Sequence, residues 1–483
     1  MSHRKLLARR IGLVAVTNLL VELNSLIMLP LLTKNLPASE YGMWVQITVT
    51  IGLVPAISLL GLPYAMARFL PAAKGRDNIR EIFYSMSVIM VFAGLAVSSV
   101  VFSMAEPIAS ALFDGRTLIV RYLSILILME CLISIPFGYF RGIQNIKKYS
   151  AFNLLKVFFS LMLVIHFIIS GKGIVGAVSG LLLADAMIFF AMISFVILDL
   201  GISFPKLKNI RDYLAFGIPT IPGNLSSWIV TSSNRYVIGI LMGTTFVGYF
   251  SPGYTLGNMI NLFIAPLSFI LPAALSEHYD KHNAGEVKAI LGSSLRLFLA
   301  LGIPAAFGLS MLSRPILDKL STPEIAAQSY LITPFMALGS LFLGIYSIIG
   351  QVLLLEKNTA LIGKIWIIAA VLNLSMSFLL VNNIGIIGGA IASLSSFFFV
   401  FIVSNYYVRR SMKIELSPVF VFKLIISSIV MSLILLGLKP EDVFELVSAI
   451  AAGAFMYFTV LLIIKGITIS DINHIKEIIL SSP

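Results

Sequence analysis

The sequence predicts an all-α polytopic membrane protein: about fourteen transmembrane helices, arranged as two six-helix bundles in a parallel repeat, followed by two C-terminal helices. Three observations carry this prediction: the apolar composition, the spacing of long apolar stretches, and a similarity between the two halves. Of the 483 residues, 58% are hydrophobic and only 12% are charged, whereas soluble domains carry about 25% charged residues. This composition excludes an ordinary soluble enzyme and a disordered chain.

The apolar stretches are each long enough to cross the hydrocarbon core of a bilayer, which takes roughly 20 residues. They lie near residues 11–33, 43–70, 82–104, 118–140, 150–170, 174–198, 213–240, 246–275, 289–312, 328–355, 360–381, 384–408, 418–438 and 445–465. The connections between them are short, and no soluble domain fits. The basic segment from Met1 to Arg10 precedes a long apolar run without a clear small-residue cleavage site, so we expect an uncleaved first span.

The distribution of basic residues over the connections supports this number of spans. The chain has 34 Lys and Arg against 22 Asp and Glu, a net charge of +12. Such a charge could indicate nucleic acid, but in a chain this apolar it favours basic loops on one membrane face. If the N-terminus is cytoplasmic, most basic residues fall in cytoplasmic connections. The external side receives only Lys34, Arg116, Arg121, Lys172, Arg314, Lys319 and Lys439. Both termini are therefore predicted to be cytoplasmic.

Two pairs of segments indicate an internal duplication. Residues 173–180 resemble residues 385–393, and residues 40–44 resemble residues 246–250. Two halves with the same orientation form a parallel repeat, and transporters of this kind place the substrate site between the halves. The predicted domains are an N-terminal bundle (1–198), a C-terminal bundle (199–411), two additional helices (412–466) and a cytoplasmic amphipathic tail (467–483).

Small residues at a spacing of four indicate close helix packing. The pairs are Gly176 with Gly180 and Gly253 with Gly257. Glycine lets two helix backbones approach each other in a membrane. The alternative is that glycine is simply common in membrane helices.

Polar stripes occupy the first predicted span of each half. The polar residues recur at helical spacing, so each set lies on one face. We expect these faces to line a cavity at the repeat interface, although hydrogen bonding between helices is an alternative. The candidate cavity-lining residues are Asn18, Glu22, Ser25, Asn224, Ser227, Thr231 and, in the eighth span, Asn258.

Four cations fall within the predicted spans and are the candidate substrate-binding groups. Arg235 and Arg296 are deep, whereas Arg68 and Lys156 lie near span ends and could snorkel towards water. A guanidinium fork fits phosphate oxygens and stays charged. An anionic substrate is therefore expected, with internal pairing, for example of Glu22 with Arg235, as the open alternative.

The sequence contains no motif for several kinds of chemistry. The sequence lacks a phosphate-binding Gly-x-x-x-x-Gly-Lys-Ser/Thr loop, which argues against ATP hydrolysis. The one cysteine, Cys131, permits no disulfide framework and no thiolate metal cluster. No metal site and no catalytic residue is predicted, since His278 and His282 lie in a polar connection without further ligands.

Several motifs along the chain resemble a known family. They are Leu36–Trp44, Gly61–Leu70, Phe216–Pro222, Ser233–Tyr236, Val247–Ser251 and Leu271–Pro272. In their order they are similar to the Wzx-type oligosaccharide flippases, the polysaccharide-exporting branch of the multidrug/oligosaccharidyl-lipid/polysaccharide transporter superfamily. The chain departs from the family pattern in one place, with Asn234 before Arg235 where an aspartate is frequent.

The resemblance implies a MATE-like fold and a transport function rather than an enzyme. Such flippases move an undecaprenyl-diphosphate-linked oligosaccharide across the bacterial cytoplasmic membrane by alternating access, for O-antigen, capsule or exopolysaccharide assembly. The implied partners are the lipid-linked oligosaccharide, membrane lipids and polysaccharide polymerase or export proteins, without nucleic acid or ATP. No cofactor is expected. Coupling to a Na⁺ or H⁺ gradient is implied, with Glu22 and Asp185 as candidate coupling residues.

Two other functions stay open. A MATE-like ion-coupled drug or small-molecule antiporter would need an acidic cavity, and the cations in the spans weigh against it. A membrane glycosyltransferase or polysaccharide polymerase would need a large external catalytic loop, which the short connections do not provide.

Overall fold

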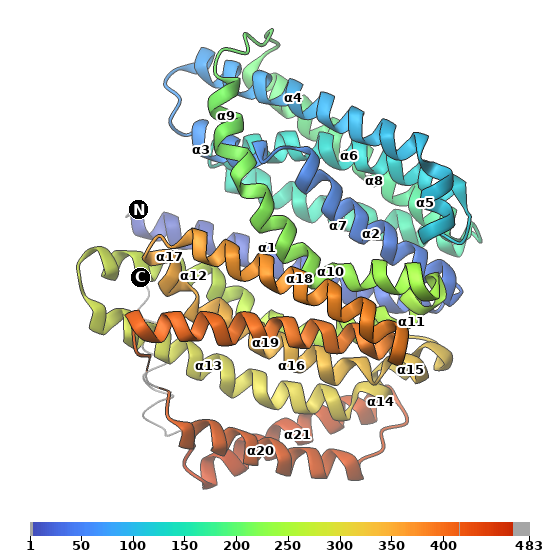
Figure 1. The fold of residues 1–483 in the computed structure, drawn as a ribbon, viewed down its shortest axis with the longest axis vertical. Helices are drawn as coiled ribbons and strands as arrows, with labels where there is room; N and C mark the ends of the chain where they lie inside the picture. Colours follow the sequence, from blue (N-terminus) through green and yellow to red (C-terminus); the bar gives the residue numbers. More distant parts are fainter. Residues whose placement is uncertain (1–2, 415, 467–483) are drawn as a thin grey trace. The chain divides into compact units, whose positions relative to one another are not determined.

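A computed structural model describes residues 3–414 and 416–466 of the chain, and within these ranges the regular elements are helices (Figure 1). The all-α prediction is thus confirmed. The chain forms two compact units, which we call the N-terminal unit (Leu20–Gly248) and the C-terminal unit (Met1–Leu19 with Tyr249–Pro483). The domain boundaries drawn from the sequence stay predictions. The proposed amphipathic tail, residues 467–483, lies outside the described residues.

The N-terminal unit is built around α6. Its helices are α1 in part (His3–Thr33), α2 (Ala38–Ser58), α3 (Leu62–Phe69), α4 (Arg76–Ser103), α5 (Ala105–Leu112), α6 (Thr117–Gly142), α7 (Ile146–Ile169), α8 (Gly173–Leu200), α9 (Ile210–Gly217), η1 (Ile218–Thr220) and α10 (Ile221–Met242). Helix α6 packs against α3, α4 and α8, and α7 packs along α8. Large side chains such as Phe83, Tyr139 and Phe140 fill the core between them.

The C-terminal unit continues with a second set of antiparallel helices. They are α11 (Thr244–Gly257), η2 (Asn258–Ile260), α12 (Asn261–Asp280), α13 (Ala284–Met311), α14 (Ser313–Leu320), α15 (Pro323–Ser329), α16 (Ile332–Ile349), α17 (Gln351–Leu355), α18 (Thr359–Ile384), α19 (Ile386–Ser411), α20 (Pro418–Gly437) and α21 (Val443–Ile463). Helix α16 packs between α13 and α19, and the final pair α20 and α21 packs on α13.

Twelve helices of the described chain are long and apolar enough to cross a membrane. Two predicted spans are not among these twelve. The first, 11–33, lies within α1, in which the segment Thr17–Thr33 is apolar. The other, 213–240, coincides with α9 and α10, where the polar stripe lowers the mean hydropathy. Both segments are nonetheless helical, and the protein is a multi-pass membrane protein.

The second predicted span, 43–70, is wrong as a single helix. Helix α2 ends at Ser58 and α3 begins at Leu62, because Leu60 and Gly61 take positive φ angles of 52° and 69°. A side chain at Gly61 would overlap the backbone of Gly217 in α9. Glycine is therefore required both by its φ angle and by the close approach.

Candidate functional site

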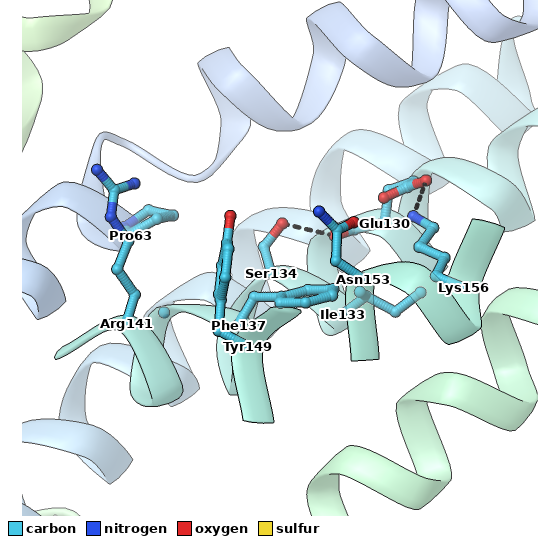
Figure 2. Close-up of a pocket in the computed structure, with 10 residues that line it drawn as sticks. Pro63, Glu130, Ile133, Ser134, Phe137, Arg141, Tyr149, Asn153 and Lys156 are labelled. Atoms are coloured by element: carbon cyan, nitrogen blue, oxygen red, sulfur yellow. Dashed lines mark hydrogen bonds and ion pairs between the residues drawn. The ribbon is translucent and has the colours of Figure 1, made fainter. Parts of the chain in front are cut away.

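A polar pocket lies inside the N-terminal unit, between α3, α6 and α7 (Figure 2). Its volume is about 230 Å³. The lining residues are Pro63 of α3, then Glu130, Ile133, Ser134, Phe137, Gly138 and Arg141 of α6, and Tyr149, Asn153 and Lys156 of α7. Two of these helices, α6 and α7, are apolar enough to span a membrane, yet they place polar and charged side chains in this hollow.

The pocket forms because α6 and α7 turn helical stripes of mostly polar residues towards each other. The stripe of α6 is Glu130, Ser134, Phe137 and Arg141, and that of α7 is Tyr149, Asn153 and Lys156. Residues spaced by three or four share one face of a helix. The turn between them is tight, since Gln144 has a φ of 57° and the Asn145 side chain caps α7 by accepting from the Lys148 N–H at 3.2 Å.

Lys156 holds two carboxylates at one end of the pocket. Its Nζ lies 2.6 Å from Oε1 of Glu130 and 3.5 Å from Oδ1 of Asp185 in α8. The Lys156 and Glu130 side chains are each 19% exposed, whereas Asp185 is fully buried. Neither Asp185 oxygen accepts a hydrogen bond. One ammonium thus contacts two carboxyl groups in apolar surroundings, where an unpaired charge is costly.

Arg141 occupies the opposite end of the pocket, and aromatic rings lie between the two ends (Figure 2). The Arg141 side chain is exposed, and its guanidinium lies 5.9 Å from the centre of the Tyr64 ring. No carboxylate pairs with it within residues 3–414 and 416–466. Phe137 and Tyr149 meet edge to face, with ring centres 5.4 Å apart. The pocket therefore presents one guanidinium without a carboxylate partner beside two aromatic rings.

Arg235 is buried on α10, away from the pocket residues. Its Nη1 donates to the Thr231 carbonyl at 3.1 Å, and its own carbonyl accepts from Nε2 of Gln46 in α2 at 3.0 Å. The neighbouring Tyr236 hydroxyl bonds to Oγ1 of Thr50 at 2.5 Å. These polar contacts fix α10 on α2, and they leave the Arg235 side chain only 8% exposed.

The other predicted residues divide into exposed groups and groups engaged in hydrogen bonds. Exposed side chains are Arg68 on α3, Arg296 on α13, and Asn18, Glu22 and Ser25 on α1. Within the part of the chain that the structure describes, Glu22 forms no ion pair with Arg235.

Hydroxyl and amide groups of the predicted stripes largely bond within the helices. Ser227 and Thr231 donate to carbonyls of α10 itself, and Asn224 is half-buried. Asn258 accepts from Oγ of Ser340 in α16 at 2.7 Å. That contact is the helix–helix hydrogen bond left open as the alternative for these residues.

Comparisons with known proteins show the family and the fold of the chain. Residues 7–275, more than half of the chain, match the family model described as polysaccharide biosynthesis protein. The chain belongs to this family. The family match confirms the resemblance to polysaccharide flippases that the sequence motifs predicted.

One curated relative of this chain is the probable low-salt glycan biosynthesis flippase Agl15 of Haloferax volcanii. The two are 22% identical over 267 residues, which cover 54% of this chain and 56% of Agl15. The chain thus matches little more than half the length of this relative.

Two solved structures share the fold of the present chain. The lipid II flippase MurJ, in an inward closed conformation, superposes with a TM-score of 0.79 at 18% identity, covering 93% of this chain and 98% of that one. An inward-facing multidrug resistance MATE family transporter gives a TM-score of 0.62 at 14% identity, covering 82% and 98%. The predicted MATE-like fold is therefore confirmed.

Sequence analysis did not single out Arg141, Tyr149, Asn153 or Glu130 as site residues. Their signal was present as two helical stripes, on 130–141 and on 149–156, with the same spacing as the stripes of α1 and α10. The stripes become meaningful only when α6 and α7 are known to face each other across one hollow.

Proposed function

We propose that this protein is a flippase that moves a lipid-linked oligosaccharide across the membrane by alternating access. One observation carries the proposal: a pocket lined in part by polar and charged side chains lies between α6 and α7, which are apolar enough to span a membrane. Polar and charged groups at that depth are costly and usually serve a transported solute or a partner group. The family and the likeness to glycan flippases support the same reading.

We further propose a specific substrate and a specific membrane. The substrate is an undecaprenyl-diphosphate-linked oligosaccharide, carried across the bacterial cytoplasmic membrane for O-antigen, capsule or exopolysaccharide assembly, beside polymerase or export proteins. Arg235, Arg296 and Arg68 are the proposed diphosphate-binding cations, because guanidinium groups bind phosphate oxygens strongly. Lys156, the fourth cation predicted for this role, already pairs with Glu130 and Asp185. Both termini are proposed to be cytoplasmic.

A reconstituted assay tests the transport function. The full chain is placed in vesicles with a fluorescent polyprenyl-diphosphate-linked disaccharide, and the fraction of probe that an added membrane-impermeant quencher reaches is followed over time. We expect protein-dependent flipping, which the substitution Arg235→Ala slows by about tenfold or more, the worth of one charge-assisted contact.

The matched control is Arg121→Ala, an exposed arginine of α6 that lies 5.6 Å from the ring centre of Phe102. It should flip the probe at the wild-type rate. Correct folding of both variants is checked by elution profile and thermal unfolding. Absence of flipping by the wild-type chain, combined with efflux of a cationic dye, would instead identify a drug antiporter.

We propose Asp185, rather than Glu22, as the residue that binds the coupling ion. Asp185 is fully buried and its oxygens accept no hydrogen bond, whereas Glu22 is exposed. A carboxylate that shares its counter-ion in apolar surroundings gains most from binding a proton or a sodium ion.

The expected result is that a Na⁺ or H⁺ gradient accelerates flipping by the wild-type chain and no longer does so after Asp185→Asn. The substitution Glu22→Gln should keep the acceleration. Applying the two gradients separately identifies the ion. A wild-type rate that neither gradient alters would contradict the coupling.

A further inference from the structure

The pocket is too small for a whole oligosaccharide. Its 230 Å³ fall below the roughly 300–1,000 Å³ of sites that enclose drug-sized ligands. It fits one ring or one compact group. Its lining comes only from α3, α6 and α7 of the N-terminal unit, so its shape is set within that unit.

The chemistry of the pocket is arranged in levels along α6. Arg141, Phe137, Ser134 and Glu130 stand on successive turns, about 5 Å apart. Tyr149 of α7 meets Phe137, and Lys156 of α7 meets Glu130. Asn153, spaced between them on α7, therefore faces the level of Ser134. Figure 2 shows this order, from Arg141 at one end to Lys156 at the other.

The middle levels suit a sugar ring. Phe137 and Tyr149 offer aromatic surface, on which the C–H face of a pyranose can pack. One turn away, the Asn153 amide can donate to a ring hydroxyl and accept from another. The Ser134 hydroxyl donates to the Glu130 carbonyl at 2.8 Å and keeps its lone pairs for a hydroxyl donor.

The Arg141 level suits an anion. The Lys156 charge is already balanced by Glu130 and Asp185, so the charge left to a ligand is the Arg141 guanidinium. Its planar fork binds carboxylate and phosphate groups through two parallel hydrogen bonds. A sugar ring packed on Phe137 and Tyr149 would hold an anionic substituent about one helical turn further along α6. The substituent would then lie within reach of the Arg141 guanidinium.

We propose that this pocket binds a single anionic pyranose, with its ring on Phe137 and Tyr149, its hydroxyls at Asn153 and Ser134, and its anionic group at Arg141. The anion has two sources of the same chemistry: the carboxylate of an acidic sugar within the glycan, or the phosphate on the reducing-end sugar. The assignment of this sugar to a transported glycan rests on the proposed function.

Equilibrium binding to the purified full chain in lipid nanodiscs tests the site. Glucuronic acid, glucose 1-phosphate, glucose and inorganic phosphate are titrated separately, and ligand NMR saturation transfer reports binding. At least one anionic sugar should bind about tenfold or more tightly than glucose and than phosphate, the worth of one charge-assisted contact. Preference for glucuronic acid identifies the acidic sugar, and preference for glucose 1-phosphate identifies the phosphate-linked one.

Two substitutions separate the anion from the ring. Arg141→Gln should reduce the affinity for the anionic sugar to that for glucose, whereas Arg121→Gln should leave it unchanged. Tyr149→Leu should weaken all sugars together and keep their order. Thermal unfolding confirms that each variant is folded. The proposal is overturned if neither anionic sugar binds better than glucose, if phosphate alone binds as well, or if Arg141→Gln changes nothing.

The experiments distinguish a wrong pocket assignment from a wrong transport function. If the anionic sugar binds as expected but the wild-type chain flips no lipid-linked probe, the transport function is wrong and the pocket stands. If the probe is flipped but no anionic sugar binds, the pocket assignment is wrong and the transport function stands.

Discussion

The two units of the protein differ in the charge that lies between their helices. In the N-terminal unit, charged contacts lie within spanning helices: Lys156 joins Glu130 of α6 to Asp185 of α8. The interior contacts described for the C-terminal unit are neutral. Its Tyr457 hydroxyl donates to the Ala300 carbonyl at 2.8 Å, and Ser340 bonds Asn258 at 2.7 Å. Such a buried cluster contributes little net stability compared with apolar packing, but the loss of one of its charges is costly.

The interior of the C-terminal unit is held by close apolar packing, which the N-terminal unit also has around Phe83 and Tyr139. A continuous apolar cluster runs through α12, α13, α16, α20 and α21, with Phe298 and Tyr457 almost fully buried in it. Gly257 lies so close to the backbone of α16 that a side chain there would overlap it. The comparison can be tested by removing one defining contact from each unit.

The largest effect is expected at Lys156. Lys156→Met leaves Glu130 and Asp185 without their shared counter-ion, and breaking such a buried pair costs about 3–5 kcal/mol. Thermal unfolding in detergent should show the loss. Lys147→Met, an exposed lysine of the same helix, should change stability by less than about 0.5 kcal/mol.

The triple variant Lys156→Met, Glu130→Gln, Asp185→Asn should recover most of that stability, because no buried charge is left unpaired. If the triple variant is as unstable as Lys156→Met alone, the loss comes from side-chain packing, and the contrast between the units disappears.

A smaller effect is expected at Gly257. A methyl group there meets Met336 and the α16 backbone, with the Ala337 nitrogen at 2.8 Å. Gly257→Ala should therefore cost about 1–3 kcal/mol through overpacking. At Gly292 of α13 no atom lies within 4 Å of an added Cβ, so Gly292→Ala should be neutral or stabilise the helix by up to about 1 kcal/mol. Equal effects at both positions would contradict the tight contact between Gly257 and α16.

The smallest effect is expected at Tyr457. Tyr457→Phe removes one neutral hydrogen bond to the Ala300 carbonyl and should cost about 1 kcal/mol. Tyr407→Phe, which removes an exposed hydroxyl, serves as the control. A loss at Tyr457 comparable to that at Lys156 would show that neutral contacts in the C-terminal unit matter as much as the charged ones.

Much of the fold could be predicted because apolar length and helical spacing are local properties. The stretches at 11–33 and 213–240 are good examples: α10 lacks the hydropathy of the twelve clearest spans, yet its polar stripe has helical spacing. The break in the second span was missed, although Gly61 marks it. The break depends on the approach of Gly217, which lies far away in the sequence.

The site was predictable only in part. Lys156 and Asp185 were found because charge inside an apolar stretch is visible in sequence. Their contact with each other, and with Glu130, was not. Arg141 was missed as a site residue because its position at the end of a span gives it the ordinary reading of a basic loop residue.

The sequence by itself determined a helical membrane protein of the polysaccharide biosynthesis family, since hydropathy, periodicity and motifs are read along the chain. Tertiary structure decided which stripes face each other, because the facing of two helices depends on packing between residues remote in sequence. For this reason only the structure could bring Arg141, Tyr149 and Lys156 around one pocket.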